Sequence, residues 1–146
     1  MIVRLAQEKD LEQILQLIKE FHSESLNAYN ILYDDDIAKI AMAKLLGTSF
    51  ILELDEKIVG VLGGMIVNYP GNNIPVYQEW IWYVNKEYRL HGVSLYNHLE
   101  NYCKENNIKK IVMVSMANSK ATKLEKFYHR LGFELLEKHY IKNLGG

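Results

Sequence analysis

The chain is poor in cysteine and proline, with one cysteine, Cys103, and two prolines among its 146 residues. A lone cysteine excludes an intrachain disulfide and makes a reducing compartment the simpler assumption. The two prolines and nine glycines argue against a disordered linker, so residues 1–146 are expected to form one domain with one buried core. The helical spacing of Cys103 from Leu95 and Leu99 favours a core thiol over a nucleophile.

Strong charge and long apolar runs are also lacking. The net charge is −1, so the sequence has no basic footprint of the kind that nucleic-acid binders carry. No apolar run approaches the length of a membrane span or of the core of a signal peptide. The five histidines lack the Glu-x-x-His or paired-cysteine spacing of a metal site. We therefore expect a cytoplasmic protein with no metal, and with neither nucleic acid nor a membrane as its partner.

Hydrophobic periodicity predicts an α/β fold with a mixed, largely antiparallel central sheet flanked by helices. The pair Gly63-Gly64 inside a predicted strand suggests a bulge. Residues 23–33 lack a steady period and are expected to form a loop, whereas the acidic run at 34–36 suits a helix N-terminus. The predicted order is β-α-α-β-β-β-α-β-α-β-β, with strands at 2–5, 49–54, 57–68, 75–84 and 110–115, helices at 9–22, 34–46, 92–106 and 120–131, and a terminal strand pair around Phe133 and Tyr140.

The segment 80–100 carries the strongest functional signal, because a strand passes through a polar loop with one glycine directly into an amphipathic helix. Backbone N–H groups from Arg89 through Ser94 are not used by a sheet there, and the helix dipole favours an anion. Gly92 lets a pyrophosphate approach the main chain, and Arg89 adds a forked cationic contact. The alternative is that Gly92 and Ser94 serve only as a turn and a helix cap.

Further downstream, Leu124, Tyr128 and Leu131 form part of a helical stripe that ends at Gly132. The two segments together resemble the GNAT N-acetyltransferase superfamily. Its acetyl-CoA loop reads Arg/Gln-x-x-Gly-x-Gly/Ala, which corresponds here to Arg89-Leu90-His91-Gly92-Val93-Ser94, and its later segment reads Phe-Tyr-x-x-x-Gly-Phe, here Phe127-Tyr128-His129-Arg130-Leu131-Gly132-Phe133. Ser94 replaces the usual Gly or Ala and Leu90 a common Gly, so this loop should be less plastic than in typical members.

The resemblance implies acetyl-CoA as cosubstrate. Its pyrophosphate would lie over Arg89, Leu90, His91, Gly92, Val93 and Ser94, and its pantetheine would pair with the strand end at Tyr83 and Val84. The backbone N–H of Val84 is the candidate for polarising the thioester carbonyl. The Asn that many members place seven residues before the motif Tyr is here Ala121, so Asn118 is the nearest residue that could make that contact with CoA.

Two side chains are candidates for the chemistry. Attack by an amine leaves a coenzyme thiolate that must be protonated, and Tyr128 matches the family position of that acid. Glu79 is the nearest carboxylate that could take the proton of the amine, directly or through water. Spacing alone leaves open that Tyr128 is a core aromatic and that Glu79 is a solvated surface residue. Alternation along the strand places Glu79 on the same side as Ile81 and Tyr83.

The expected function is therefore transfer of the acetyl group of acetyl-CoA to a primary amine of a small molecule or peptide, by direct attack in a ternary complex. The alternative is a non-catalytic acyl-CoA-binding or interaction module with the same fold. A nucleotide-binding domain of another family is disfavoured, because neither a Gly-x-Gly-x-x-Gly run nor a P-loop Gly-Lys-Ser/Thr is present. The Tyr-rich strand end leaves a homodimer open.

Overall fold

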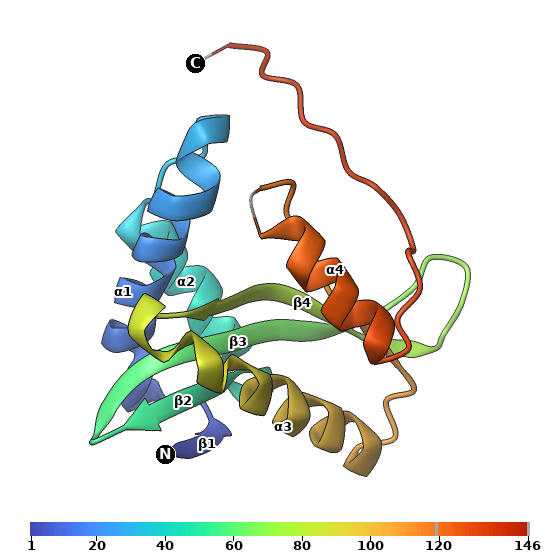
Figure 1. Cartoon of the computed structure of the whole chain (residues 1–146), viewed down its shortest axis with the longest axis horizontal. Coiled ribbons are helices and arrows are strands. Elements are labelled where there is room, and N and C mark those ends of the chain that lie inside the picture. Colours follow the sequence, from blue (N-terminus) through green and yellow to red (C-terminus); the bar gives the residue numbers. More distant parts are fainter. Residues whose placement is uncertain (119, 146) are drawn as a thin grey trace.

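The computed structural model describes residues 1–118 and 120–145 (Figure 1). Its strands form one five-stranded sheet in the order β1-β2-β3-β4-β5, in which neighbours are antiparallel except for the parallel pair β4 and β5. This confirms the predicted mixed, largely antiparallel sheet with flanking helices. The elements are β1 (Ile2–Leu5), α1 (Leu11–Phe21), α2 (Asp35–Leu45), β2 (Phe50–Leu54), β3 (Lys57–Asn68), β4 (Pro75–Val84), α3 (Gly92–Glu105), β5 (Lys110–Val112) and α4 (Ala121–Arg130).

Helices cover both faces of the sheet, with α1 and α2 on one side and α3 on the other (Figure 1). Alternation along β2 distributes its side chains between two cores, because Ile51 packs with α1 and α2 whereas Phe50 and Leu52 pack with α3. Cys103 is 1% exposed in the second core, which confirms the interpretation of a core thiol. The stripe of Leu95, Leu99 and Cys103 therefore marks the buried face of α3 correctly, whereas Leu131, at the end of the predicted stripe at 124–131, is 39% exposed.

A β-bulge interrupts the pairing of β3 with β4. Gly63 pairs with Ile81 and Gly64 pairs with Glu79, so Trp80 is the extra residue on β4. An extra residue reverses the alternation of side chains beyond it. The prediction that Glu79 shares a side with Ile81 and Tyr83 was wrong for this reason, although the glycine pair correctly indicated a bulge.

The two cores show this reversal. Tyr77, before the bulge, packs in the α3 core, whereas Ile81 and Tyr83, after it, pack in the α1 core. Glu79 accordingly lies near the α4 residue Tyr128, and its charge helps to raise the pKa of that tyrosine. The bulge therefore decides where the carboxyl group of Glu79 points.

We predict that Gly64→Ala destabilises the protein by about 1–3 kcal/mol, because overpacking of a tight site forces the backbone to move. A Cβ at Gly64 would collide with the Gln78 carbonyl oxygen and lie 2.8 Å from the Tyr77 ring. Gly47→Ala is the matched control, since a Cβ at Gly47 has nothing within 4 Å. Urea unfolding should separate the two variants; equal midpoints would mean that the bulge does not depend on Gly64.

The region after α1 is more helical than the sequence predicts. A π-helical turn, His22–Leu26, continues α1, and a 3₁₀ turn, Asn27–Tyr29, follows it, so only the end of the predicted 23–33 loop is irregular. α2 begins as expected, because the Asp34 carboxylate accepts a hydrogen bond from the Ile37 N–H at 3.0 Å. The acidic run is thus a helix cap in the structure.

The C-terminal prediction was wrong. Residues 131–145 contain no strand, so the terminal strand pair around Phe133 and Tyr140 is absent from that described stretch, and β5 ends at Val112 instead of residue 115. Strand propensity describes residues that fit a sheet, but a strand forms only where its backbone groups find a ladder partner. Here the chain after α4 leaves the sheet (Figure 1).

Candidate functional site

The candidate site is a cleft where β4 and β5 separate. Residues 76–78 of β4 pair with residues 110–112 of β5, after which β4 continues while the chain beyond β5 diverges from it. A cavity of about 130 Å³ opens at this divergence. We call it the cleft; it is lined by Phe21, Glu24, Ser25, Glu79, Trp80, Ile81, Trp82, Tyr83, Val114, Met116, Asn118, Lys120 and Leu124.

Glu79 is the buried carboxyl group of the cleft. It follows the last residue of β4 that pairs with β5, and 5% of it is exposed. Burial raises its pKa to about 8, although a hydrogen bond from the Val114 N–H partly opposes this shift. A carboxyl group with this pKa exchanges its proton near neutral pH, which suits a general base.

Tyr128 reaches the same point of the main chain from α4. Its hydroxyl donates to the Val114 carbonyl oxygen at 2.8 Å, and burial, followed by the charge of Glu79, raises its pKa above the usual value. Val114 therefore contacts both groups, through its N–H and its C=O. The structure brings together the two side chains that the sequence singled out, a neutral phenol and a carboxyl group. Val114 itself lines the cleft, and Tyr128 contacts Val114 from α4.

The predicted phosphate loop is more ordered than expected. Residues Lys86–His91 form a 3₁₀ helix that joins α3 directly, and Gly92 has φ −61° and ψ −31°, which any residue can adopt. The Gly92 N–H bonds to the Arg89 carbonyl, and the Ser94 hydroxyl bonds to the His91 carbonyl at 2.5 Å. The loop therefore offers fewer free N–H groups than predicted, and the unusual dihedrals expected of Gly92 are not used. Leu90, His91 and Val93 are exposed.

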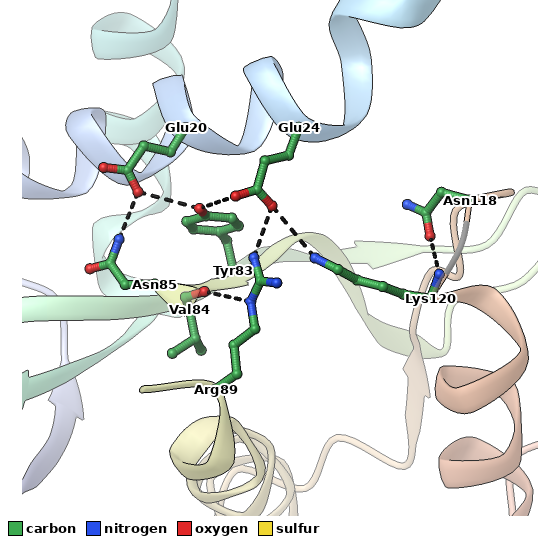
Figure 2. A network of polar contacts seen from close by, with 8 residues as sticks. All are labelled: Glu20, Glu24, Tyr83, Val84, Asn85, Arg89, Asn118 and Lys120. Atoms are coloured by element: carbon green, nitrogen blue, oxygen red, sulfur yellow. Dashed lines mark hydrogen bonds and ion pairs between the residues drawn. The ribbon is translucent and has the colours of Figure 1, made fainter. Parts of the chain in front are cut away.

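Arg89 points back across the end of β4 (Figure 2). Its Nε donates to the Val84 carbonyl at 3.1 Å, its Nη2 lies 2.8 Å from Glu24 Oε2, and its guanidinium carbon lies 5.7 Å from the centre of the Tyr83 ring. The Tyr83 hydroxyl also donates to Glu24, at 2.9 Å. The side chain expected to bind phosphate is thus already paired with a carboxylate.

Glu24 is the centre of a polar network that the sequence did not reveal. Burial disfavours its ionisation, but hydrogen bonds from Tyr83 and Arg89 outweigh this effect and hold its pKa below the usual value. Lys120 Nζ lies 3.5 Å from the same carboxylate, and Glu20 accepts from Asn85 at 2.6 Å beside it (Figure 2). The spacing of Glu20 and Glu24 by four residues is the one signal that could have indicated a shared helix face.

A second, more open depression of about 360 Å³ adjoins this network. Its lining combines three cations with Glu24, and it shares Asn118 with the cleft. We call it the basic depression; it is lined by Glu24, Ser25, Lys86, Arg89, Asn118 and Lys120. Because Asn118 lines both spaces, this predicted residue lies at their junction. Its side chain accepts a hydrogen bond from the Lys120 N–H at 3.0 Å. Cations here can hold an anion whose other end enters the cleft.

The strand end also offers backbone groups to the cleft side. The Asn85 N–H bonds to the Val59 carbonyl on β3 at 2.9 Å. N–H groups of successive strand residues point to opposite edges, so the Val84 N–H points away from β3. This is the orientation that pairing with an extended amide-containing arm would need.

In residues 1–118 and 120–145, no group of three or more His, Cys, Asp or Glu side chains is arranged to hold a metal ion. No helix within those ranges combines the length and the apolar character needed to cross a bilayer.

A protein-family model described as the acetyltransferase (GNAT) family matches residues 11–133. No curated protein sequence matches the chain. Among solved structures, the fold is similar to that of a ribosomal-protein-alanine N-acetyltransferase from Brucella melitensis biovar Abortus 2308, with 16% identity, 98% of each chain covered and a TM-score of 0.76. It is also similar to AAC(6')-Iy in complex with a bisubstrate analog, with 19% identity, 99% of this chain and 98% of the other covered, and a TM-score of 0.74. A third similar structure is that of a predicted acetyltransferase with acetyl-CoA from Clostridium acetobutylicum. It is 19% identical in sequence, with a TM-score of 0.73, and the alignment covers 98% of this chain and 96% of the other.

Proposed function

Since the chain belongs to the GNAT acetyltransferase family, we propose that it transfers the acetyl group of acetyl-CoA to a primary amine of a small molecule or peptide. The observation that carries this proposal is the meeting of Glu79 and Tyr128 on the backbone of Val114, at the point where β4 and β5 separate. A base and an acid held by the backbone of one residue beside a cavity suit a reaction that removes a proton from one atom and delivers a proton to another.

In the proposed reaction the amine nitrogen attacks the thioester carbon, and negative charge develops on the carbonyl oxygen. The Val84 N–H, which points away from β3, stabilises this oxygen. Glu79 as carboxylate accepts the proton that the amine loses. When the carbon–sulfur bond breaks, the electron pair stays on sulfur, and Tyr128 protonates the thiolate after its hydroxyl leaves the Val114 carbonyl.

For the cosubstrate, we propose that the basic depression receives the diphosphate of CoA. Lys86, Arg89 and Lys120 supply the positive charge, and Asn118 supplies an amide. The pantetheine would run from there along β4 into the cleft. The 3₁₀ helix of residues 86–91 then contributes less through free N–H groups than through the side chain of Arg89.

The acceptor we propose is a cationic amine. Glu24 and Glu79 line the cleft together with the aromatic rings of Phe21 and Trp80, and carboxylates and ring faces both attract ammonium groups. The names of similar structures span a ribosomal-protein alanine and an acetylneamine analog, so the shared fold accommodates peptide and small-molecule acceptors alike. The side chains that line the cleft of this chain would decide whether it takes a peptide or a small-molecule acceptor.

We expect Glu24→Gln to lower the dissociation constant of CoA several-fold at low ionic strength. The Glu24 carboxylate now pairs with Arg89 and Lys120, and a diphosphate must displace it to bind the same cations. Arg89→Ala should weaken binding about tenfold, since it removes a charge-assisted hydrogen bond. Calorimetry in low and high salt measures both changes.

Glu20→Gln is the matched control for Glu24→Gln, because Glu20 bonds to Tyr83 and Asn85 and to neither of those cations. It should leave CoA affinity unchanged. Weaker CoA binding in Glu24→Gln than in the wild type would contradict a diphosphate site at Arg89 and Lys120.

The direct test of the proposed function is release of free thiol from acetyl-CoA with a panel of polyamines, aminoglycosides and N-terminal peptides. Turnover with at least one amine, and acetylated product in stoichiometric amount, would support the enzyme. If CoA raises the thermal transition but no amine promotes thiol release, the protein is a non-catalytic acyl-CoA-binding module instead.

A further inference from the structure

The cleft carries carboxyl groups from two different elements. Glu79 lies on β4 and is 5% exposed, whereas Glu24 lies on the π-helical turn that continues α1, with 24% of its side chain exposed. Glu24 also lines the basic depression, so it lies where the two spaces meet. Glu79 instead accepts a hydrogen bond from the Val114 N–H, beside the end of β5. The two carboxyl groups therefore mark two separate points of the cleft.

The cleft is also narrow and largely apolar. Its cavity of about 130 Å³ is smaller than the roughly 300–1,000 Å³ that is typical of pockets for drug-sized ligands. The apolar side chains of its lining include Phe21, Ile81, Trp82, Met116 and Leu124. A slender alkyl chain with charged ends matches such a space better than a sugar ring or a folded peptide does.

Contacts across the cleft favour a thin acceptor as well. Lys120 Nζ lies 3.5 Å from Glu24 Oε2, and the Tyr29 hydroxyl donates to the Ala117 carbonyl oxygen at 3.4 Å. Both contacts join the segment that follows α1 to the segment between β5 and α4. A bulky acceptor would have to separate these segments and would lose both contacts.

Glu24 is charged, and its partners are cations that the proposed diphosphate also needs. Although burial disfavours its ionisation, hydrogen bonds from Tyr83 and Arg89 hold its pKa below the usual value (Figure 2). When CoA takes Arg89 and Lys120, Glu24 keeps the Tyr83 hydroxyl but loses both cations. A partly buried carboxylate that has lost its cations attracts a replacement.

We propose that the acceptor is an aliphatic diamine, whose reacting nitrogen lies at Glu79 and whose second ammonium group takes the place of Arg89 and Lys120 at Glu24. This inference rests on the acetyl transfer and on the diphosphate site proposed above. The methylene chain between the two nitrogens lies along the apolar lining, which removes it from water. The ammonium group at Glu24 forms a charge-assisted hydrogen bond.

The chemistry at the reacting nitrogen is unchanged. That nitrogen attacks as the neutral amine, the carbon–nitrogen bond forms, and the proton of the amine goes to Glu79. The carbon–sulfur bond breaks, and the thiolate takes the proton of Tyr128. The second nitrogen keeps its proton throughout, so it serves recognition alone.

The exchange of cations at Glu24 couples the two substrates. In the free protein a diamine competes with Arg89 and Lys120 for this carboxylate. Bound CoA removes that competition, and its diphosphate adds negative charge nearby. CoA and the diamine must then raise each other's affinity by the same factor. A monoamine has no group for Glu24 and gains nothing from the exchange.

Thiol release from acetyl-CoA tests the substrate class, with diaminoalkanes from diaminoethane to diaminohexane and with the monoamine of each length. For the best diamine, kcat/KM should exceed that of its monoamine about tenfold or more, because the diamine adds a charge pair that is partly shielded from water. The rate should peak at one chain length, since Glu24 and Glu79 lie on fixed elements. Glu24→Gln should bring the two kcat/KM values to within about twofold of each other.

Glu20→Gln is the matched control, because Glu20 lies on the same helix face but bonds to Tyr83 and Asn85. It should keep the preference for the diamine. Equal kcat/KM values for diamines and monoamines in the wild type would overturn the proposal and leave acetyl transfer standing. An equal loss of the preference in both variants would also overturn it, since the effect would then come from acidic charge in general.

Calorimetry tests the site independently of turnover. The same diaminoalkanes are titrated into the free protein and into the CoA-saturated protein, with the monoamines as reference. CoA should lower the dissociation constant of the tightest diamine about fivefold or more in the wild type, and should leave it unchanged in Glu24→Gln. Equal constants with and without CoA in the wild type would overturn the proposal. Coupled binding without thiol release from any amine would support the diamine site and reject the proposed acetyl transfer.

Discussion

Tyr128→Phe is expected to lower the rate of acetyl transfer by about 10²–10³-fold while leaving the dissociation constant of acetyl-CoA within about twofold. General acid catalysis contributes factors of this order, and the substitution removes the only proton that the ring can donate. Burial and the nearby Glu79 raise the pKa of the phenol, so it stays protonated throughout the working pH range. Steady-state kinetics at saturating acceptor and calorimetry with CoA separate the two quantities.

Tyr96→Phe is the matched control for this loss of a buried hydroxyl. Tyr96 is 1% exposed and donates to Glu100 at 2.9 Å, on α3 and away from the lining of the cleft. Each substitution should cost about 1 kcal/mol of stability through a lost hydrogen bond. Only Tyr128→Phe should lose turnover. Thiol release at wild-type rates in that variant would reject Tyr128 as the acid.

The sequence predicts the framework well because periodicity is a local property. The stripe of Leu95, Leu99 and Cys103 depends on neighbouring residues alone, and it identifies the buried face of α3 correctly. The side on which Glu79 lies depends instead on Gly64, a residue of another strand, because the bulge there reverses the alternation. Simple alternation therefore misplaced the residue that matters most.

The polar network around Glu24 could not be predicted from the sequence for a similar reason. Glu24, Arg89 and Lys120 come from three separate segments, and their contacts exist only after those segments meet. Loop chemistry predicted a phosphate site from Gly92, whereas the Gly92 N–H is already bonded in the structure, and the diphosphate site that we propose relies on side chains around the basic depression. The incorrect prediction of a terminal strand pair around Phe133 and Tyr140 shows the same limit, since strand-forming residues cannot specify which edge they pair with.

We expect the maximal rate to rise tenfold per pH unit below about pH 8 and to level off above it, because Glu79 must lose its proton before it can accept one. Burial disfavours the charged carboxylate and raises its pKa to about 8, so the active form predominates on the alkaline side. Glu79→Gln should abolish this dependence and lower the plateau rate about 10²-fold. Rates from pH 6 to pH 9.5 with saturating substrates give the profile.

The same pKa has a consequence for folding, which provides an independent control. The folded state holds the Glu79 proton more tightly than the unfolded chain, whose carboxyl has a pKa near 4.5, so this stabilisation is complete below pH 4.5 and is lost as the pH rises to about 8. A shift of this size corresponds to roughly 5 kcal/mol. Between pH 5 and pH 9 the wild type should lose stability to urea, whereas Glu79→Gln should lose less. If the rate keeps its slope in Glu79→Gln while the stability difference appears, the titrating group is the acceptor amine and Glu79 is not the base.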